Sequence, residues 1–336
     1  MKIVFFEVPK EEQAIFTNLL TGFEVSFFEE KLNEDSVSKA KDADIVSVFI
    51  NSVLSKEIIE SIPNLKFITT RSTGFDHIDR DFCATKNIKV SNVPAYGSKT
   101  VAEYAFALLL SLTRKIFNSS RQLKEEGDFS IFQFQGMDLN EKTIGVIGTG
   151  KIGKNTIKIA KGFGMNILAY DLYPDLAFAK EIGFEYKSLD ELFAQSDAIS
   201  LHAPYSKENH HLINKESISK MKKGVYLINT ARGELVDTDA LVWGLEEGII
   251  GGAGLDVLEG ERELKEELEI LSDEGKRDKI KDYKTLFEDR VLIEMQNVIV
   301  TPHIAFYSKE AEGEIIKMTA ENIKAFNLGN PQNLVK

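Results

Sequence analysis

The sequence predicts an α/β protein with two doubly wound parallel sheets. Two series of short apolar runs alternate with helical segments, and a glycine-rich turn marks the start of the second series. A chain of 336 residues is long enough for two domains, and a composition of 43% hydrophobic and 28% charged residues is ordinary for a globular protein. Because parallel strands need crossover helices, we expect helices on both faces of each sheet.

The first series lies in the amino-terminal part of the chain. We read MKIVFFE as a first strand rather than a signal peptide, because Glu7 interrupts the short apolar stretch. The helix at 98–112 is the most apolar in the chain, but it is shorter than the roughly 20 residues that a bilayer requires and contains Glu103, so we expect it to be buried. The strand-like runs are KIVFF, EVSFF, DIVSVFI, LKFITTR and IKVSN.

The second series indicates an inserted domain. Its runs are TIGVIG, NILAYD, DAISLHA, GVYLINT, GGAGLDV and NVIVTP. The helical segment after them, 305–330, has no strands of its own to cover and is expected to return to the first domain. We therefore predict a discontinuous, flavodoxin-like substrate domain over 1–97 and 304–336, with a Rossmann domain over 98–303 inserted into it. The charge-dense segment 259–294 is interpreted as a solvated helical insertion rather than a binding segment.

A dinucleotide site is predicted where the second series begins. Residues 144–153 read IGVIGTGKIG, a strand that ends in Gly148, Gly150 and Gly153 before a helical pattern. The first glycine permits a tight turn, the second lets the backbone approach a pyrophosphate, and the third lets the helix pack closely on the sheet. Lys151 and Ile152 begin that helix, whose amino-terminal end favours phosphate.

The acidic residue that ends the next strand predicts the choice of cofactor. Asp171 closes NILAYD and is placed to accept hydrogen bonds from the adenosine ribose hydroxyls, while its charge repels the extra phosphate of NADP. No Arg or Lys in the following DLYPDLA offsets that repulsion. The predicted cofactor is NAD.

Three charged residues follow strands of the second series and form a candidate catalytic set. Arg232 in NTARG stays charged and presents a planar fork for a carboxylate, and His303 in TPHIAFYS titrates near neutral pH and can act as acid or base. Glu261 in DVLEGE would stabilise the imidazolium and orient the ring. Taken singly, each could be structural. His202 in SLHAP also ends a strand and is a rival base.

Bulk properties exclude several classes of partner. A net charge of −12 argues against a nucleic-acid partner, which needs a basic face. The single cysteine, Cys83, excludes an intrachain disulfide and indicates a reducing compartment, so we expect a cytoplasmic protein with no membrane association. We read Cys83 as a small buried helix residue, and we predict no metal site.

The combination of motifs resembles the D-isomer-specific 2-hydroxyacid dehydrogenase family. NTARGELVD, GAGLDVLEGE and TPHIAFYS occur in order with VIGTGKIG, RSTGFDHID and NVPAYGSKTVAEYA over nearly the whole chain. The resemblance implies that Arg232 binds substrate, Glu261 supports the histidine and His303 is the acid/base. It also implies that the backbone of Thr73 and Gly74 holds the substrate carboxylate near Tyr96, that Phe49 and Phe306 wall its side chain, and that the cofactor is lined by His202, Ala203, Pro204, Thr230, Ala231 and Asp256.

Within that family, TPHIAFYS and the AY of NVPAY are most similar to D-lactate dehydrogenases. The expected activity is therefore reversible, NAD-dependent reduction of pyruvate, in a cleft between the domains. The alternatives are relatives that act on 2-hydroxyisocaproate, glyoxylate or 3-phosphoglycerate, and, less favoured, a non-enzymatic NAD sensor or corepressor. The resemblance and the apolar helix 98–112 together predict a homodimer through that helix. The segment 262–294 differs in length and composition from what the resemblance leads us to expect.

Overall fold

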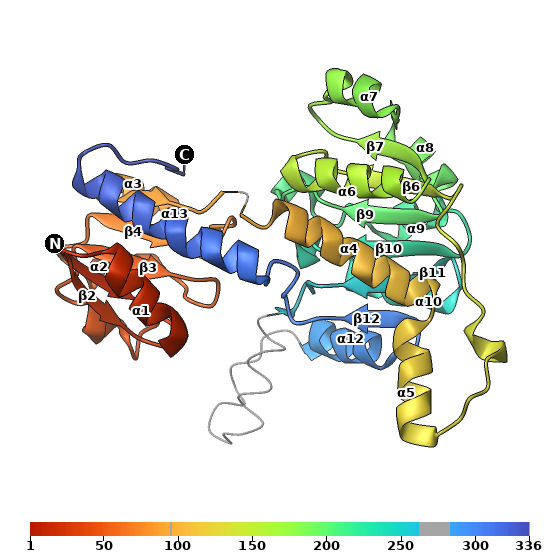
Figure 1. Cartoon of the computed structure of the whole chain (residues 1–336), viewed down its shortest axis with the longest axis horizontal. Helices are drawn as coiled ribbons and strands as arrows, with labels where there is room; N and C mark the ends of the chain where they lie inside the picture. Colours follow the sequence, from red (N-terminus) through yellow and green to blue (C-terminus); the bar gives the residue numbers. More distant parts are fainter. Residues whose placement is uncertain (95, 262–282, 336) are drawn as a thin grey trace. The chain divides into compact units, whose positions relative to one another are not determined.

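The chain forms two compact α/β units, which confirms the predicted fold class. A computed structural model describes residues 1–94, 96–261 and 283–335 (Figure 1). One unit comprises Met1–Tyr96 and Tyr307–Lys336, and the other comprises Gly97–Phe306. The sequence predicts domain boundaries after residues 97 and 303, whereas the two units divide after Tyr96 and Phe306. Ala95 of NVPAY and most of the charged insertion, 262–282, lie outside the described residues.

The first unit has a five-stranded sheet in which every pair of neighbouring strands is parallel. The strand order is β2-β1-β3-β4-β5, the flavodoxin-like order, with its switch point between β1 and β3. The strands are β1 (Lys2–Phe5), β2 (Glu24–Phe27), β3 (Ile45–Val48), β4 (Phe67–Thr70) and β5 (Lys89–Ser91).

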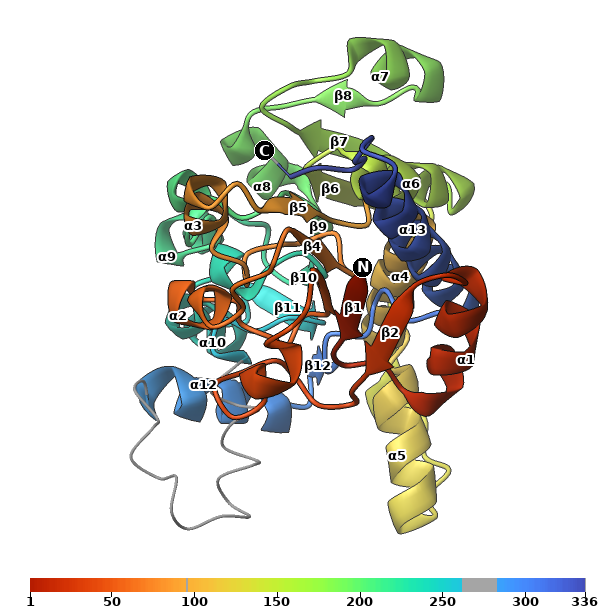
Figure 2. The same cartoon turned by 90° about the vertical axis from the view of Figure 1, so that its left-hand side faces the viewer.

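Helices cover both faces of this sheet, as Figure 2 shows. Ile58 and Cys83 pack on one face, and Phe16 and Ile316 pack on the other, so each face has its own apolar core. The burial of Cys83 agrees with its reading as a core residue. The helical elements are α1 (Lys10–Leu19), η1 (Val37–Ala40), α2 (Lys56–Glu60), α3 (Arg80–Thr85) and α13 (Lys309–Asn327).

The second unit has a seven-stranded parallel sheet in the order β12-β11-β10-β9-β6-β7-β8. The chain order reverses between β6 and β9, which is the Rossmann switch point. The strands are β6 (Thr143–Ile147), β7 (Asn166–Tyr170), β8 (Glu185–Tyr186), β9 (Ala198–Leu201), β10 (Val225–Asn229), β11 (Ile250–Leu255) and β12 (Val298–Val300).

The helices of the second unit also form two layers (Figure 1). One layer buries Phe106, Ile157 and Phe178 against the sheet, and the other buries Leu192 and Leu241. The helical elements are α4 (Ser98–Thr113), α5 (Ile116–Glu126), η2 (Phe132–Phe134), α6 (Lys151–Gly162), α7 (Leu176–Ile182), α8 (Leu189–Gln195), η3 (Lys207–Asn209), α9 (Lys215–Ser219), η4 (Gly233–Leu235), α10 (Thr238–Glu246) and α12 (Tyr283–Glu294).

The apolar character of α4 has an explanation within a single chain. Val101, Ala105, Leu108 and Leu112 are buried, and the helix packs on α6, β10 and β11 of its own unit. The inference that its apolarity reflects a second subunit is therefore not needed to explain its sequence. Among the described residues, no helix combines the length and the apolarity needed to cross a bilayer.

Candidate active site

The glycine turn has the geometry that a bound pyrophosphate requires. A Cβ at Gly148, where φ is +92°, would lie 2.5 Å from the amide nitrogen of Ala203, and a Cβ at Gly153 would clash with the carbonyl oxygen of Gly148. Apart from Gly150 and its two chain neighbours, no heavy atom of the described residues lies within 4 Å of the Cβ position at Gly150, the residue before α6. The turn is thus closed on the protein side and open at the amino-terminal end of the helix, as phosphate binding needs.

Asp171 lies at the carboxyl end of β7 beside this turn. Its carboxylate accepts hydrogen bonds from the amide (2.5 Å) and hydroxyl (2.8 Å) of Thr149 and from the amide of Tyr173 (2.9 Å). Burial raises the pKa of Asp171, but these hydrogen bonds and the charge of Lys154 outweigh burial, so its pKa lies below the ordinary value. The group is therefore a fixed anion at neutral pH.

One cation near Asp171 was not anticipated from the sequence. Lys154, on α6, forms a 2.5 Å ion pair with Asp175. Because Asp175 shares that positive charge, Lys154 only partly offsets the repulsion that Asp171 exerts on a second phosphate. Lys154 lies one helix earlier in the chain than DLYPDLA, so the sequence of that segment does not predict this cation.

The ends of β9 and β10 present buried polar atoms. In the described part of the chain, Nδ1 of His202 and Oγ1 of Thr230 have no hydrogen-bond partner. Nε2 of His202 lies 2.9 Å from the Ser200 hydroxyl and 3.0 Å from the Thr156 hydroxyl. Burial lowers the pKa of His202 to about 3, so this imidazole stays neutral and is poorly suited to proton exchange near pH 7.

The three candidate catalytic residues follow three adjacent strands. In the order β12-β11-β10, His303 comes after β12, Glu261 after β11 and Arg232 after β10. Parallel strands end at the same edge of a sheet, so these residues lie at one edge. A Cβ at Gly233 would clash with the backbone of Leu258, which shows how closely the segments after β10 and β11 approach each other.

His303 is held in an unusual backbone conformation. Its φ is +57°, in the left-handed region that non-glycine residues seldom adopt. The carboxylate of Asp256 fixes the turn, because it accepts hydrogen bonds from the Thr301 hydroxyl (2.5 Å) and the amides of Ile304 (3.0 Å) and Ala305 (2.8 Å). Burial raises the pKa of Asp256 even though these hydrogen bonds oppose it.

The imidazole of His303 pairs with Glu261. Nδ1 lies 3.1 Å from Oε1 and 3.2 Å from Oε2 of the carboxylate. Because an ionised carboxylate can only accept, Nδ1 carries a proton, and Nε2 is the atom that can exchange one. Both side chains are only partly exposed, which suits a positioned acid/base pair.

Arg232 is placed by the turn after β10. The Asn229 side chain donates to the carbonyl of Arg232 (2.8 Å) and accepts from the amide of Ala231 (3.0 Å). One guanidinium nitrogen, Nη1, donates to the carbonyl of Ala231 (2.7 Å). This hydrogen bond fixes the orientation of the guanidinium group.

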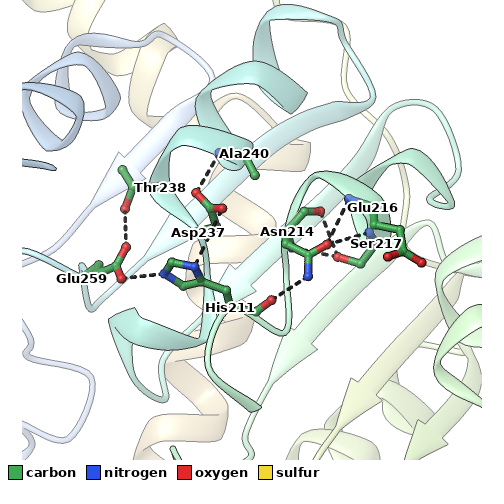
Figure 3. Close-up of polar contacts among 8 residues, drawn as sticks. All are labelled: His211, Asn214, Glu216, Ser217, Asp237, Thr238, Ala240 and Glu259. Atoms are coloured by element: carbon green, nitrogen blue, oxygen red, sulfur yellow. Dashed lines mark hydrogen bonds and ion pairs between the residues drawn. The ribbon is translucent and has the colours of Figure 1, made fainter. Parts of the chain in front are cut away.

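A second histidine–glutamate pair is formed by His211 and Glu259 (Figure 3). Nε2 of His211 lies 2.6 Å from Glu259, and Nδ1 lies 3.8 Å from Asp237. His210, His211 and Glu259 present possible ligand atoms within 4.8 Å of one another. However, the two imidazole rings stack 3.8 Å apart at 24°, so their in-plane lone pairs do not converge on one ion. We read the contacts of His211 with Glu259 and Asp237 as a structural network that secures the segment leading to Glu261.

The first unit contains most of the expected substrate-binding residues. The segment after β4 is held by hydrogen bonds from the Thr73 hydroxyl to Val93 (3.0 Å), from the Asn92 amide to Thr73 (2.8 Å) and from the Ser72 hydroxyl to Gly74 (2.6 Å). Within the described part of the chain, no acceptor binds the amides of Thr73 and Gly74. Phe49 follows β3, and Tyr96 ends this stretch of the unit, whereas Phe306 belongs to the second unit.

Comparison with known proteins identifies the family. The NAD-binding domain of D-isomer specific 2-hydroxyacid dehydrogenases matches residues 106–305. The chain belongs to this family. The D-lactate dehydrogenase of Aquifex aeolicus, solved with NAD and lactic acid, has a TM-score of 0.86 and 40% identity, covering 98% of this chain and 96% of that one. The family assignment and the NAD-binding domain confirm the predicted cofactor.

Two curated relatives show that activities vary within the family. The Escherichia coli D-lactate dehydrogenase is 38% identical over 94% of this chain and 93% of its own length. An aromatic 2-oxoacid reductase of Clostridium sporogenes is 37% identical over 98% of this chain and 97% of its own. This chain is thus an oxidoreductase of the 2-hydroxyacid dehydrogenase family, and overall similarity does not discriminate between small and aromatic substrates.

Proposed function

We propose that this protein is an NAD-dependent D-lactate dehydrogenase that reduces pyruvate reversibly. The observation that carries the proposal is the contact between His303 and Glu261, at the same sheet edge as Arg232 and the glycine turn. A sensor that only bound NAD would have no need of a paired, partly exposed acid/base. The resemblance to D-lactate dehydrogenases in TPHIAFYS supports pyruvate as the substrate.

The proposed chemistry assigns one task to each side chain. Bound NADH supplies the hydride that C2 of the 2-oxo acid receives. His303 donates the proton on Nε2 to the C2 oxygen, so that the carbonyl becomes a hydroxyl, and Glu261 stabilises the imidazolium form beforehand. In the reverse direction, His303 accepts that proton. Arg232 binds the carboxylate and polarises the carbonyl, and the amides of Thr73 and Gly74 contribute further donors to the carboxylate.

The residues that would hold NAD follow the carboxyl edge of the second sheet. The glycine turn would receive the pyrophosphate, Asp171 the adenosine ribose, and Asp256 would position the nicotinamide through the turn that it fixes. The buried polar atoms of His202 and Thr230 are available to the cofactor. The remaining proposed contacts are Lys151, Ile152, Ala203, Pro204 and Ala231.

A substrate panel tests the proposal. We expect kcat/KM to be highest for pyruvate with NADH, because Phe49 and Phe306 are proposed to wall a compact pocket. Pyruvate, 2-ketoisocaproate, glyoxylate and phenylpyruvate should be compared, each with NADH and NADPH. Much faster turnover of 2-ketoisocaproate or phenylpyruvate would contradict the lactate assignment while leaving the family unaffected. No turnover of any of the four acids would contradict the proposed reaction itself.

We also propose a cytoplasmic homodimer. The single cysteine is consistent with a reducing compartment. Support for self-association comes from large apolar side chains exposed on α5 and the segment after it, including Phe117, Phe129 and Phe132. Large exposed apolar side chains that lie close together in the sequence favour an interaction surface.

A further inference from the structure

Glu7, which follows β1, binds the segment after β3 with its carboxylate. Oε2 accepts hydrogen bonds from the amides of Phe49 (3.0 Å) and Ser52 (3.2 Å) and from the Ser52 hydroxyl (2.5 Å). Oε1 accepts one from the amide of Asn51 (2.9 Å). One side chain therefore satisfies the donors of a whole turn more than forty residues away in the sequence.

Glu7 lies just beyond the carboxyl end of β1, at the point where the strand order of the sheet reverses. β1 and β3 are neighbours, and the strand order reverses between them. In open α/β sheets, ligands bind beyond the carboxyl ends of the strands at such a switch point. Here a carboxylate of the protein itself spans the switch point and fixes the turn that bears Phe49.

Arg71, which follows β4, holds Glu7 from the far side of β3. Arg71 is 2% exposed, and its guanidinium donates to the carbonyls of Phe6 (2.6 Å) and Glu7 (2.7 Å) and to the Ser47 hydroxyl (2.9 Å). The carbonyl contact supports Glu7 at a φ of +58°, which is rarely adopted by a residue with a side chain. The guanidinium carbon also lies 5.9 Å from the centre of the Phe49 ring, within cation–π range.

The charges of this cluster are complementary. Burial lowers the pKa of Arg71 to about 10, and the charges of Glu7 and Glu12 oppose that shift, so the guanidinium remains a cation at neutral pH. The partly exposed Glu7 and the buried Arg71 therefore form a charged support, with hydrogen bonds to the backbone at both ends. Such a support holds one conformation because breaking any contact leaves a charge or a donor unpaired.

We propose that Glu7 is a positioning residue that sets substrate selectivity by fixing Phe49 in the wall of the substrate side-chain pocket. This inference rests on the proposed function, in which Phe49 contacts the side chain of the 2-oxo acid. With Phe49 held in place, the pocket accepts a methyl group and discriminates against bulky side chains. When the support is lost, the turn at 49–52 relaxes and the discrimination declines.

A carboxylate is required at this position, and an amide of equal size cannot replace it. The four groups that bind the carboxylate of Glu7 are all donors, and its two oxygens can accept all of them. In Glu7→Gln, the amide NH2 would face backbone N–H groups and leave at least one of them unsatisfied. Hydrogen bonds to a charged group are among the stronger ones in proteins, so we expect the loss of one to change the specificity ratio by about tenfold.

The test compares Glu7→Gln with Glu60→Gln, a control at an exposed glutamate that ends α2 of the same unit. We expect Glu7→Gln to lower the ratio of kcat/KM for pyruvate to kcat/KM for phenylpyruvate by about tenfold. Most of the change should lie in KM, and the dissociation constant for NADH, measured by fluorescence, should not move. Glu60→Gln should behave as the wild type.

Hydrogen exchange supplies a readout that does not depend on turnover. The amides of Phe49, Asn51 and Ser52 should exchange faster in Glu7→Gln than in the wild type or the control. If Glu7→Gln does not accumulate as folded protein, Ser52→Ala is the second variant. It removes one of the four hydrogen bonds to the Glu7 carboxylate, together with the bond that the Leu32 amide donates to the Ser52 hydroxyl (2.9 Å). It should shift both measurements less, in the same direction. Unchanged exchange, or a substrate ratio within twofold of the wild type in the folded variant, would overturn the inference. A wild type inactive on every acid would instead refute the proposed function, while the exchange result would still judge the role of Glu7.

Discussion

Nδ1 of His303 lies 3.1 Å from the carboxylate of Glu261, whereas Glu259, two residues earlier, binds His211 at 2.6 Å. The two glutamates of one short segment therefore serve two histidines. Of the two, only His303 follows β12, the outermost strand of the second sheet, which pairs with β11. This separation makes the two carboxylates a matched pair for experiments, because the same substitution at each position should have different consequences.

Glu261→Gln should lower kcat, and Glu259→Gln should mainly lower stability. The first substitution removes the charge that stabilises imidazolium at His303, so we expect kcat for pyruvate to fall at least about tenfold. The second removes the charged partner of His211 and should cost about 1 kcal/mol of unfolding free energy, with kcat within about threefold. Steady-state kinetics and urea unfolding measure both. Equal losses of kcat in the two variants would contradict the assignment of Glu261 as the partner of the acid/base.

His303→Ala should lower pyruvate reduction by about 10²-fold or more, the usual contribution of a positioned acid/base. The affinity for NADH, followed by fluorescence titration, should stay close to that of the wild type because the cofactor contacts proposed here lie elsewhere. His210→Ala is the control, since that imidazole is exposed. Turnover that survives in His303→Ala would remove this residue from the acid/base role.

Asp171→Ala should weaken the preference for NADH over NADPH. The fixed anion is expected to bind the ribose hydroxyls of NAD and to repel the extra phosphate of NADP. We expect the ratio of kcat/KM for NADPH to that for NADH to rise by about tenfold or more, helped by the nearby Lys154. Asp190→Asn, at an exposed position on α8, serves as the control. A wild type that used both cofactors equally well would contradict this role of Asp171.

The raised pKa of Glu12 predicts that the free energy of unfolding declines as the pH rises. Burial raises the pKa of Glu12 from 4.5 to about 7, assisted by Glu312 and Glu11 and opposed by Arg71. The folded state therefore binds a proton more tightly than the unfolded state does, and this proton binding stabilises the fold. The stabilisation is complete below about pH 4.5 and is lost as the pH rises through about 7.

Glu12→Gln should remove that part of the pH dependence. The free energy of unfolding of the variant, relative to that of the wild type, should be about 1 kcal/mol higher at pH 8 than at pH 5. This value is kept small because solvent screens a half-buried group. Urea unfolding at the two pH values measures the difference, and Glu24→Gln, at an exposed residue of β2, is the control. A wild type and variant that change in parallel would show that Glu12 titrates normally.

Much of the architecture could be predicted because buried parallel strands have a simple signature. The apolar runs in both series became strands, and their carboxyl ends brought Arg232, Glu261 and His303 to one sheet edge. β8 was missed because Glu185–Tyr186 is a two-residue edge strand without an apolar run. The charged insertion is helical where it is described at its carboxyl-terminal end, over Tyr283–Glu294.

The contacts that position the site could not be predicted in the same way. Which glutamate of DVLEGE binds His303 depends on His211, whose location is set by the tertiary fold. Asp256 fixes the turn of His303 through backbone amides, and Glu7 does the same for Phe49. Bonds from a side chain to distant backbone groups leave no residue pattern in the sequence, because any residue can supply an amide.

The exposed apolar segment after α5 predicts how the protein associates. Phe129 and Phe132 are 82% and 91% exposed, a large cost in water unless another surface covers them. Replacing both with serine should convert the proposed dimer into a monomer while leaving NADH affinity unchanged, as measured by sedimentation velocity and fluorescence titration. Leu328→Ser, at an exposed apolar residue of the first unit, should not alter the oligomer and controls for the loss of surface apolarity. A wild type that sediments as a monomer, or a double variant that still sediments as a dimer, would show that this segment does not join two chains.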